Sequence, residues 1–493
     1  MIWLLAGACA LAAIPAGLRW LRIAQREHYL APAASRFALR WWSSGPYNPL
    51  LLFMAVAGVA GTLLDTRLGL LTAFAQVGPI GLSTRGRTSP LSWTARLRRV
   101  AAAVAIVLLA ALAAGVVMET PLVIVLSVLL LPVIVDFCLL LLAPLERKLG
   151  DRWVEKAARR LEDSGARVVA ITGSYGKTTT KQYVRHLLAK SAPTVASPAS
   201  FNNRMGLARA INDHLVPGTE VFIAEMGTYG PGEISDLCRW IEPSVAAIVS
   251  IGPVHLERFR SEERIVAAKS EIFERADKGV ISVDHPLLEA LAAEHRADLE
   301  ITTVSVSGKP SDIRYEEGSI RSRGVAVGVV PESVFPANLA VAVGIVEALG
   351  YEVDGGLFAS LPASEHRQNV TVAPSGVTVI DDTFNSNPAG AARALATLGR
   401  QPGKKVLVTP GMVELGPLQA SENETLANAA ATICDEVIIV GTTNRKALLR
   451  GASKGPASVT VVPTRDAAVA VVRDRLGPGD AVLYENDLPD HYP

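Results

Sequence analysis

The stretch Arg167-Val-Val-Ala-Ile-Thr172-Gly173-Ser174-Tyr175-Gly176-Lys177-Thr178-Thr179-Thr180 sets the fold of the larger part of this chain. Its first six residues are largely apolar and β-branched, which predicts a short buried strand. The amphipathic run 182–189 predicts a helix soon after the glycines. A strand, a glycine-rich turn and a helix N-terminus form a phosphate-binding loop, because backbone N–H groups and the helix dipole converge on the anion.

The side chains of this loop predict the binding of a nucleotide together with Mg²⁺. Lys177 would reach the β- and γ-phosphates, and the hydroxyl of Thr178 would ligate the metal. The spacing departs from the usual G-x-x-x-x-G-K-[ST], because isoleucine occupies position 171. A glycine turn that merely precedes a helix therefore stays open as the alternative. The predicted nucleotide-binding residues of the loop are Gly173, Ser174, Tyr175, Gly176, Lys177, Thr178 and Thr179.

Beyond the loop, short apolar runs rich in β-branched residues alternate with helical runs. This alternation predicts an α/β fold with parallel sheets and helices on both faces. Residues 339–349 predict one of these helices, and we place a hinge between two such sheets at residues 362–365. The predicted strands are 221–225, 245–251, 279–283, 377–381, 406–409, 436–440, 459–462 and 481–484.

The first 146 residues are of a different kind. Between Val100 and Pro144 the only charged residues are Glu119 and Asp136. Asp136 lies inside an apolar run, where a carboxylate is either a functional group or a helix-packing group. Two of the runs are short for a spanning helix, so a re-entrant hairpin over residues 49–82 stays open. We expect an α-helical membrane region of about five spans, from the apolar runs 2–18, 49–64, 68–82, 100–118 and 121–142.

Basic residues indicate the orientation of this region. Arginines and lysines gather in segments 19–40, 83–99 and 147–160, whereas the intervening turns carry almost none. Because basic loops stay on the cytoplasmic side, we expect the N-terminus outside and the remainder of the chain in the cytoplasm. The chain is then a multi-pass protein of the cell (inner) membrane, with the lipid bilayer as a partner.

Charge and cysteine content exclude other classes of protein. The chain has 48 basic and 47 acidic residues, a formal net charge of +1, so no overall basic field predicts a nucleic-acid partner. Its four cysteines are scattered, without a CxxC pair. That spacing argues against a disulfide framework and against a zinc ribbon.

Further motifs follow the loop in a fixed order. They are Phe201-Asn202-Asn203-Arg204-Met205-Gly206, Ala224-Glu225-Met226-Gly227, His255-Leu256-Glu257, Ala268-Lys269-Ser270-Glu271-Ile272-Phe273, Asn338-Leu-Ala-Val-Ala and Asp381-Asp382-Thr383-Phe384-Asn385-Ser386-Asn387-Pro388. Together with the loop, the series resembles the Mur ligases, the ATP-dependent amide-forming enzymes of cell-wall synthesis. It is most similar to the branch that adds D-alanyl-D-alanine, and the resemblance covers about residues 168–483.

The resemblance implies three domains. They are a transmembrane region at 1–146, a P-loop central ATP-binding domain at 147–362 and a Rossmann-like C-terminal domain at 363–493. Mur ligases normally begin with a soluble domain that grips the UDP part of their precursor. Here the membrane region would replace that domain, so the resemblance implies a carboxylate substrate carried by, or made near, the membrane.

The resemblance also implies the reaction: ATP phosphorylates a carboxylate, and an amine attacks the acyl phosphate to give an amide. Lysine and metal ions would neutralise the transferring phosphoryl group. By motif, Lys177, Lys269 and His255 are catalytic, and Lys269 occupies the position of a lysine that is carbamylated in the family. Two Mg²⁺ sites are implied, the first with Thr178 and the second with Glu225 and His255. The carbamylated Lys269 would approach the magnesium site.

The remaining motif positions complete the implied site. Asn338 would contact adenine, Arg367 the ATP phosphates and Asp382 the ribose, while Asn202, Asn203 and Asn385 would contact substrate. From the residues alone, alternatives stay open for three positions. His255 also fits a buried, hydrogen-bonded histidine, Lys269 a solvated helix lysine and Asn338 a helix N-cap.

Our leading hypothesis is a membrane-anchored, ATP- and Mg²⁺-dependent ligase that faces the cytoplasm. It would join a lipid-linked or membrane-proximal cell-wall carboxylate to the amine of an amino acid or dipeptide. One alternative is a ligase of the polyglutamate-synthase type, and another is a membrane scaffold that binds ATP without turnover. The acidic and aromatic tail that contains Glu485–His491 has no role that the sequence predicts.

Overall fold

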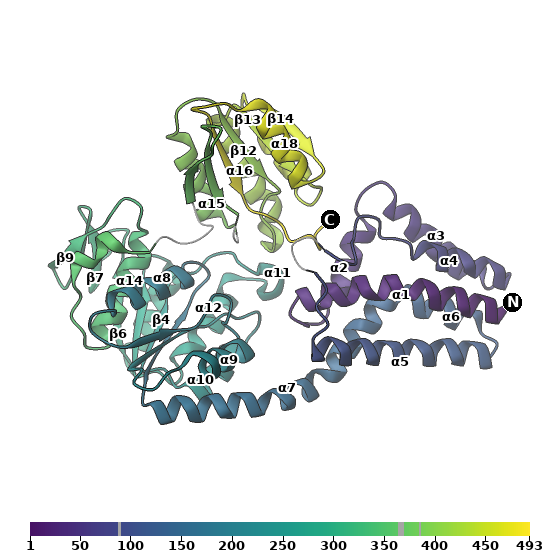
Figure 1. Ribbon diagram of the computed structural model, residues 1–493, viewed down its shortest axis with the longest axis horizontal. Helices are drawn as coiled ribbons and strands as arrows, with labels where there is room; N and C mark the ends of the chain where they lie inside the picture. Colours follow the sequence, from purple (N-terminus) through teal and green to yellow (C-terminus); the bar gives the residue numbers. More distant parts are fainter. Residues whose placement is uncertain (87–89, 363–368, 384–385) are drawn as a thin grey trace. The chain divides into compact units, whose positions relative to one another are not determined.

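The computed structural model describes residues 1–86, 90–362, 369–383 and 386–493 (Figure 1). The chain forms two compact units. Unit 1 contains residues 1–149, 402–411 and 427–493, and unit 2 contains residues 150–401 and 412–426.

Helices make up the N-terminal part of unit 1. Helix α1 packs against α4, α5 and α6, with large side chains such as Trp20, Phe37 and Ile124 buried between the helices. Apolar side chains on the outer surface, including Leu11, Phe53 and Ile106, are exposed. The elements are α1 (Ile2–Arg26), α2 (Ala33–Trp42), α3 (Asn48–Gly61), η1 (Thr66–Gly69), α4 (Leu70–Ala75), α5 (Ala95–Val117), α6 (Pro121–Leu129) and α7 (Leu131–Ser164), which continues into unit 2.

The helix lengths correct the expected number of spans. Among the described residues, α1 and α5 are long and apolar enough to cross a membrane. Helices α6 and α7 would add a third span if this pair, bent by 72°, counts as one. Helix α3 has only 14 residues, about 21 Å, against a hydrocarbon core of about 30 Å. By length and composition, the described residues therefore form two or three candidate spans instead of the five expected. The segment α3, η1 and α4 has the size of the re-entrant hairpin that the sequence left open.

Asp136 has a packing role. Its carboxylate lies in α7 and accepts hydrogen bonds from the backbone N–H groups of Ala34 at 3.0 Å and Ser35 at 2.8 Å. These two residues lie in the first turn of α2, which has no side-chain cap of its own. Asp136 therefore satisfies N–H groups that an α-helix leaves without internal partners at its start.

Four parallel strands form the other part of unit 1. They are β12 (Lys405–Thr409), β13 (Glu436–Val440), β14 (Ser458–Val462) and β15 (Ala481–Glu485), in the order β15-β12-β13-β14. Helices α17 (Arg445–Ala452) and α18 (Arg465–Arg475) alternate with these strands. Helix α16 (Gln419–Ile433) begins in unit 2 and ends in unit 1. The strands predicted at 406–409, 436–440, 459–462 and 481–484 are confirmed.

Unit 2 contains a nine-stranded sheet in the order β2-β3-β1-β4-β5-β6-β7-β8-β9. The pairs from β2 to β7 are parallel, whereas β7, β8 and β9 pair antiparallel. The sequence did not predict this antiparallel extension, whose side chains are largely polar or partly exposed. The strands are β1 (Arg167–Thr172), β2 (Thr194–Ala196), β3 (Val221–Glu225), β4 (Val245–Ile248), β5 (Lys278–Ser282), β6 (Glu300–Ser305), β7 (Ile313–Glu316), β8 (Ser319–Ser322) and β9 (Val325–Val329).

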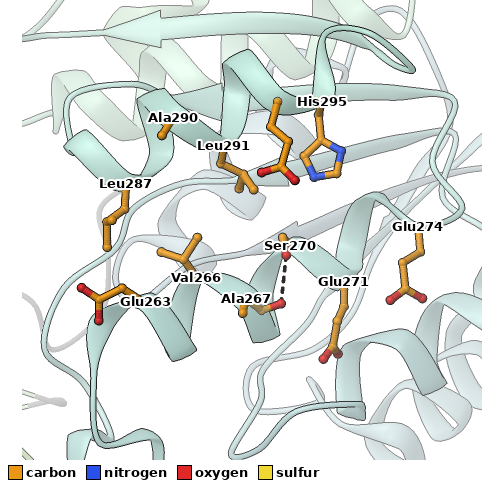
Figure 2. A pocket seen from close by; sticks show the side chains of 11 residues that line it. Glu263, Val266, Ala267, Ser270, Glu271, Glu274, Leu287, Ala290, Leu291 and His295 are labelled. Atoms are coloured by element: carbon orange, nitrogen blue, oxygen red, sulfur yellow. Dashed lines mark hydrogen bonds between the residues drawn. The ribbon is translucent and has the colours of Figure 1, made fainter.

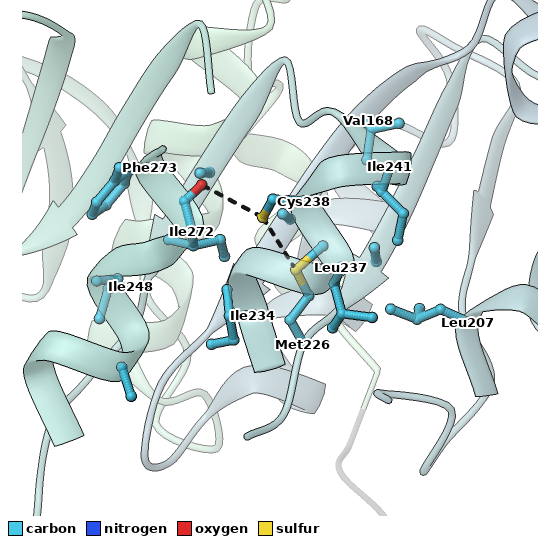
Figure 3. Close-up of a cluster of buried hydrophobic side chains, with 14 of the residues drawn as sticks. Val168, Leu207, Met226, Ile234, Leu237, Cys238, Ile241, Ile248, Ile272 and Phe273 are labelled. Carbon is cyan, nitrogen blue, oxygen red and sulfur yellow. Dashed lines mark hydrogen bonds between the residues drawn. The ribbon is translucent and has the colours of Figure 1, made fainter. Parts of the chain in front are cut away.

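Helices cover both faces of this sheet, so its central strands are apolar on both sides. In β1, Val168 and Ala170 join one core, part of which Figure 3 shows around Cys238. Val169 and Ile171 join the opposite core. The remaining elements of unit 2 are α8 (Lys177–Leu187), α9 (Arg204–His214), α10 (Glu233–Ile241), α11 (Leu256–Phe259), α12 (Glu262–Ser270), η2 (Glu271–Phe273), α13 (Pro286–His295), α14 (Pro336–Ala348), η3 (Gly355–Ser360), the antiparallel pair β10 (Asn369–Val372) and β11 (Thr378–Asp382), α15 (Pro388–Gly399) and η4 (Gly416–Leu418).

Cysteine pairing agrees with the sequence. Cys9, Cys138, Cys238 and Cys434 are all free and buried. The expected absence of a disulfide framework is therefore confirmed for these four residues, and each acts as a small apolar side chain.

Candidate nucleotide and metal site

The predicted phosphate loop connects β1 to α8, at the edge of the sheet where the parallel strands end. Gly176 is the N-cap of α8 and has a φ of 79°, a conformation that favours glycine. A Cβ atom there would lie 2.5 Å from the side-chain nitrogen of Asn338. Asn338 donates from this nitrogen to Gly176 O at 2.9 Å. It lies within α14, whose N-cap is Phe335, so the N-cap alternative for Asn338 is wrong.

Ser250, which follows β4, holds the loop in place. Ser250 O accepts from Ser174 N at 2.8 Å, and Ser250 Oγ accepts from Tyr175 N at 2.9 Å. Ser174 Oγ donates to Gly252 O at 3.1 Å. These bonds connect side and main chain across two neighbouring strands, so the loop backbone is preorganised. The sequence did not single out Ser250 or Gly252, because they are about 75 residues from the loop along the chain.

Two lysines converge on one carbonyl of the loop. Lys177 Nζ donates to Gly173 O at 2.6 Å, and Lys269 Nζ donates to the same oxygen at 3.1 Å. Lys269 lies in the last turn of α12 and is only 4% exposed, so the solvated alternative is wrong. Burial lowers the pKa of Lys269 well below its usual value, and the charge of Lys177 acts in the same direction. Burial of the amine and the nearby charge of Lys177 therefore both disfavour the charged form of Lys269.

Glu225, at the end of β3, faces α8. Its Oε2 accepts from Thr178 Oγ1 at 3.0 Å and from Lys181 Nζ at 2.8 Å. Burial alone would raise the pKa of the Glu225 carboxyl, but the charges of Lys181 and Lys177 and the two hydrogen bonds outweigh burial and lower it. Lys181 is a site residue that the sequence analysis missed. Its position, one helical turn after Lys177 on the same face, was the available signal.

The paired oxygens of Thr178 and Glu225 fit Mg²⁺. This ion prefers a few protein oxygens and completes its shell with water and substrate phosphates. The sequence motifs place Thr178 at a first metal and Glu225 at a second, and both assignments stay predictions; the structure brings the two side chains together. Across the described residues, no group of three or more His, Cys, Asp and Glu side chains is arranged around a common metal position. The described side chains alone therefore do not form a complete metal site, and oxygens of the substrate would have to complete it.

His255 has a partner other than Glu225. It is the N-cap of α11, has a φ of 53°, and its Nδ1 forms a hydrogen bond with a carboxylate oxygen of Glu414. Its ring also lies 5.0 Å from that of Tyr229, centroid to centroid. His255 is half-exposed, so the buried alternative does not describe it. Its role as a ligand of a second Mg²⁺ stays a prediction, and Glu414 is a neighbour that the sequence did not indicate.

The predicted substrate and ribose contacts are only partly placed. Asn203 is the N-cap of α9 and accepts from Gly206 N at 3.0 Å, which is a structural role. Asn202 O accepts from Gly227 N at 2.8 Å, close to the end of β3. Asp382 ends β11 and is buried. Arg367 and Asn385 lie outside the described residues, so their predicted roles are untested.

A separate pocket between α12 and α13 is lined by acidic side chains (Figure 2). Glu271 accepts from the backbone nitrogens of Gly232 at 2.7 Å and Ser235 at 3.1 Å, at the start of α10. Glu274 accepts from Ser235 Oγ at 2.6 Å. Glu271 therefore caps the N-terminus of α10, and Glu274 binds a side-chain hydroxyl of the same helix. The pocket lies on a different face of α12 from Lys269 and does not belong to the nucleotide site.

Two family models match the chain. The Mur ligase middle domain matches residues 171–342, and the Mur ligase, glutamate ligase domain matches residues 366–484. The UDP-N-acetylmuramoyl-tripeptide–D-alanyl-D-alanine ligase of Mycobacterium tuberculosis (strain ATCC 25618 / H37Rv) is 30% identical over 366 residues. That alignment covers 66% of this chain and 71% of the relative.

Solved structures give the same picture. MurF ligase from Thermotoga maritima, in complex with ADP, has a TM-score of 0.58 and 27% identity over 69% of this chain and 80% of that one. MurF from Acinetobacter baumannii has a TM-score of 0.59 and 24% identity over 68% and 77% of the two chains. The second likeness supports the fold alone. The residues that match the Mur ligase middle domain, 171–342, include the loop, Glu225 and Lys269.

Proposed function

This chain belongs to the Mur ligase family and is an ATP-dependent ligase, and we propose that it joins a carboxylate of a peptidoglycan precursor to an amine through an acyl phosphate. The carboxylate oxygen would take the γ-phosphoryl group from ATP. The amine nitrogen would then attack the acyl carbon, and phosphate would leave with the former carboxylate oxygen. One observation carries the proposal: Lys177, Lys269 and the Thr178–Glu225 pair meet at one loop.

Each of these side chains has a defined task in the proposed reaction. Lys177 supplies a positive charge where negative charge develops on the transferring phosphoryl group. Thr178 and Glu225 supply hard oxygen ligands for Mg²⁺, and Lys181 holds the Glu225 carboxylate in place. Lys269, when carbamylated, becomes an anion beside this metal position. Ser250 and Asn338 fix the loop backbone on either side.

The amine substrate is proposed from the relatives. The curated relative from Mycobacterium tuberculosis is named for the addition of D-alanyl-D-alanine, so we propose a dipeptide or amino acid as the amine. The same relatives disfavour a polyglutamate-synthase type. A scaffold without turnover is disfavoured because the residues for phosphate and metal are brought together. We also propose that nucleic acid is not a partner of this protein.

We further propose that the carboxylate is lipid-linked or made at the membrane. The supporting observations are the two or three apolar helices of membrane-spanning length, all before residue 171 where the family match begins. The proposed domains are a transmembrane region at 1–146, a P-loop central domain at 147–362 and a Rossmann-like C-terminal domain at 363–493. The protein would lie in the cell (inner) membrane as a multi-pass protein with its catalytic part in the cytoplasm.

Product mass spectrometry tests this proposal. The full chain in detergent is incubated with ATP, Mg²⁺ and D-alanyl-D-alanine, and with either a soluble UDP-muramyl tripeptide or a membrane lipid extract. We expect ADP release that depends on the amine. We also expect the lipid-linked acceptor to gain the mass of the amine minus one water, because one amide bond forms. Gain on the soluble precursor alone would reject the lipid-linked substrate but keep the ligase. If no acceptor gave a mass gain or amine-dependent ADP release, the ligase assignment itself would be contradicted.

Cysteine labelling in intact cells tests the orientation. All four native cysteines are buried and are first replaced. With an impermeant reagent we expect label on Met118→Cys, in the exposed turn after α5, and none on Ser191→Cys, after α8. Thr66→Cys, in the short connection from α3 to α4, should stay unlabelled because α3 is too short to reach the outer surface. Label on Ser191→Cys in unbroken cells would overturn the cytoplasmic assignment.

A further inference from the structure

Residues 486–493, which follow β15, pack onto the helical part of unit 1. Asp490 forms an ion pair with Arg22 of α1. His491 Nε2 hydrogen-bonds Glu27 Oε1 at 3.1 Å, and His491 O accepts from Trp41 Nε1 of α2 at 2.8 Å. Asp490 and His491 thus contact α1 and α2 through both main-chain and side-chain atoms, although about 450 to 470 positions separate them in the sequence.

Aromatic rings complete this contact. The Phe37 ring lies 4.8 Å from that of His491 and 5.0 Å, edge-on, from that of Tyr492. The guanidinium of Arg40 lies over the Tyr492 ring, 5.5 Å from its centroid. Such pairs contribute beyond the area that they bury. The helical part therefore offers an aromatic surface next to its charged partners, and His491 is itself only 2% exposed.

The charges in this contact are buried, which makes the pairing specific. Arg22 is 2% exposed and Glu27 is 5% exposed. A buried charge is tolerated only when it is paired and hydrogen-bonded. Arg22 also donates to Ser83 O at 2.7 Å, and Glu27 also accepts from Arg36 at 2.8 Å. The helical part thus holds a polar pocket in which the tail supplies a carboxylate and an imidazole.

The tail is short, so this contact restrains the sheet that it follows. Glu485 ends β15 and is bonded to Thr409 of β12. Asp490 lies five positions after Glu485, a reach of at most about 18 Å. The strands β12–β15 therefore cannot move far from α1 and α2 while the tail is bound.

We propose that residues 486–493 are a C-terminal latch, and that Arg22, Glu27, Phe37 and Trp41 form its binding site on the helical part. The latch fastens the last sheet of the ligase to the proposed membrane region. It is a property of the fold and does not depend on which carboxylate or amine the enzyme uses. The acidic and aromatic tail thereby gains a role that the nucleotide site did not provide.

Reversing the two charges of the ion pair, one at a time and together, tests the latch in the full chain. The single variants Arg22→Asp and Asp490→Arg should each speed hydrogen exchange of residues 486–493 at least about tenfold, because each breaks this ion pair and brings two like charges together. The Tyr492 N–H, which donates to Pro489 O at 3.0 Å, belongs to this segment. The double variant Arg22→Asp/Asp490→Arg restores an ion pair of reversed sense and should slow the exchange again. Mass spectrometry of the C-terminal peptide measures it.

Two further variants keep the test decisive. Trp41→Phe removes the indole N–H that donates to His491 O, together with part of the buried ring, and places no acid in a buried position. It should also speed exchange of residues 486–493. Asp474→Arg makes the same charge change at an exposed position of α18 and should leave that exchange unchanged. Unchanged exchange in Asp490→Arg, or a double variant as fast as the faster single variant, would overturn the latch.

Discussion

Replacing Lys177 by alanine is expected to lower ligase turnover by about 10²- to 10⁵-fold while the fold stays intact. Lys177 begins α8 and already lies at the loop, 2.6 Å from Gly173 O. Its ammonium would meet the β- and γ-phosphates, where a preorganised charge acts mainly on the transition state. The loss should therefore appear in kcat more than in the affinity for nucleotide, because loop backbone amides still bind the phosphates.

Amine-dependent ADP release by the purified full chain measures this effect. Lys190→Ala is the matched control, because Lys190 is exposed and pairs only at the surface with Asp354. The control should keep the wild-type rate, and both variants should unfold at the wild-type temperature. Near wild-type turnover by Lys177→Ala would remove the phosphate loop from the proposed mechanism.

The sequence could predict the local part of this site. A buried strand, a glycine turn and a helix are adjacent in the chain, so β1, Gly176 and α8 follow from patterns within about 20 residues. The sequence could not predict which side chains from other strands complete the loop. Ser250 carries no signal of its own, and its bonds to the loop form only when parallel strands end at the same edge. Lys181 had only its spacing from Lys177 as a signal, and its partner Glu225 comes from another strand. The family resemblance supplied Glu225 and Lys269, which periodicity alone would not.

The helical region shows a different limit. Run length alone suggested two spans between residues 49 and 82, but α3 and α4 are too short for this. They pack closely at Gly58, where an added Cβ would lie 2.5 Å from Thr72 Oγ1. Such packing depends on small residues in contact, which hydropathy does not report. Asp136 is similar, because its partners lie about 100 residues earlier, at the start of α2.

Lys269→Ala is the second variant with a large expected effect, and its rescue distinguishes a chemical role from a structural one. The Lys269 amine is buried, and burial lowers its pKa well below the usual value, which favours the neutral form of the amine. A neutral amine nitrogen can attack CO₂, losing one proton to give a carbamate. As pH falls through the lowered pKa, the amine is protonated and the carbamate is lost. We therefore expect activity to fall at acid pH and to depend on bicarbonate.

In the alanine variant, turnover should drop by orders of magnitude, as for Lys177→Ala, and acetate should restore part of it by filling the emptied anionic position. Lys269→Arg should be inactive with or without acetate, because a guanidinium keeps a positive charge at that position. Acetate should not rescue Lys177→Ala, whose missing group is a cation. Carbon-13 NMR with labelled bicarbonate should show a carbamate signal in the wild-type chain that is absent from Lys269→Ala. Full activity of Lys269→Ala, or an acetate effect equal in both alanine variants, would show that Lys269 only packs against the loop.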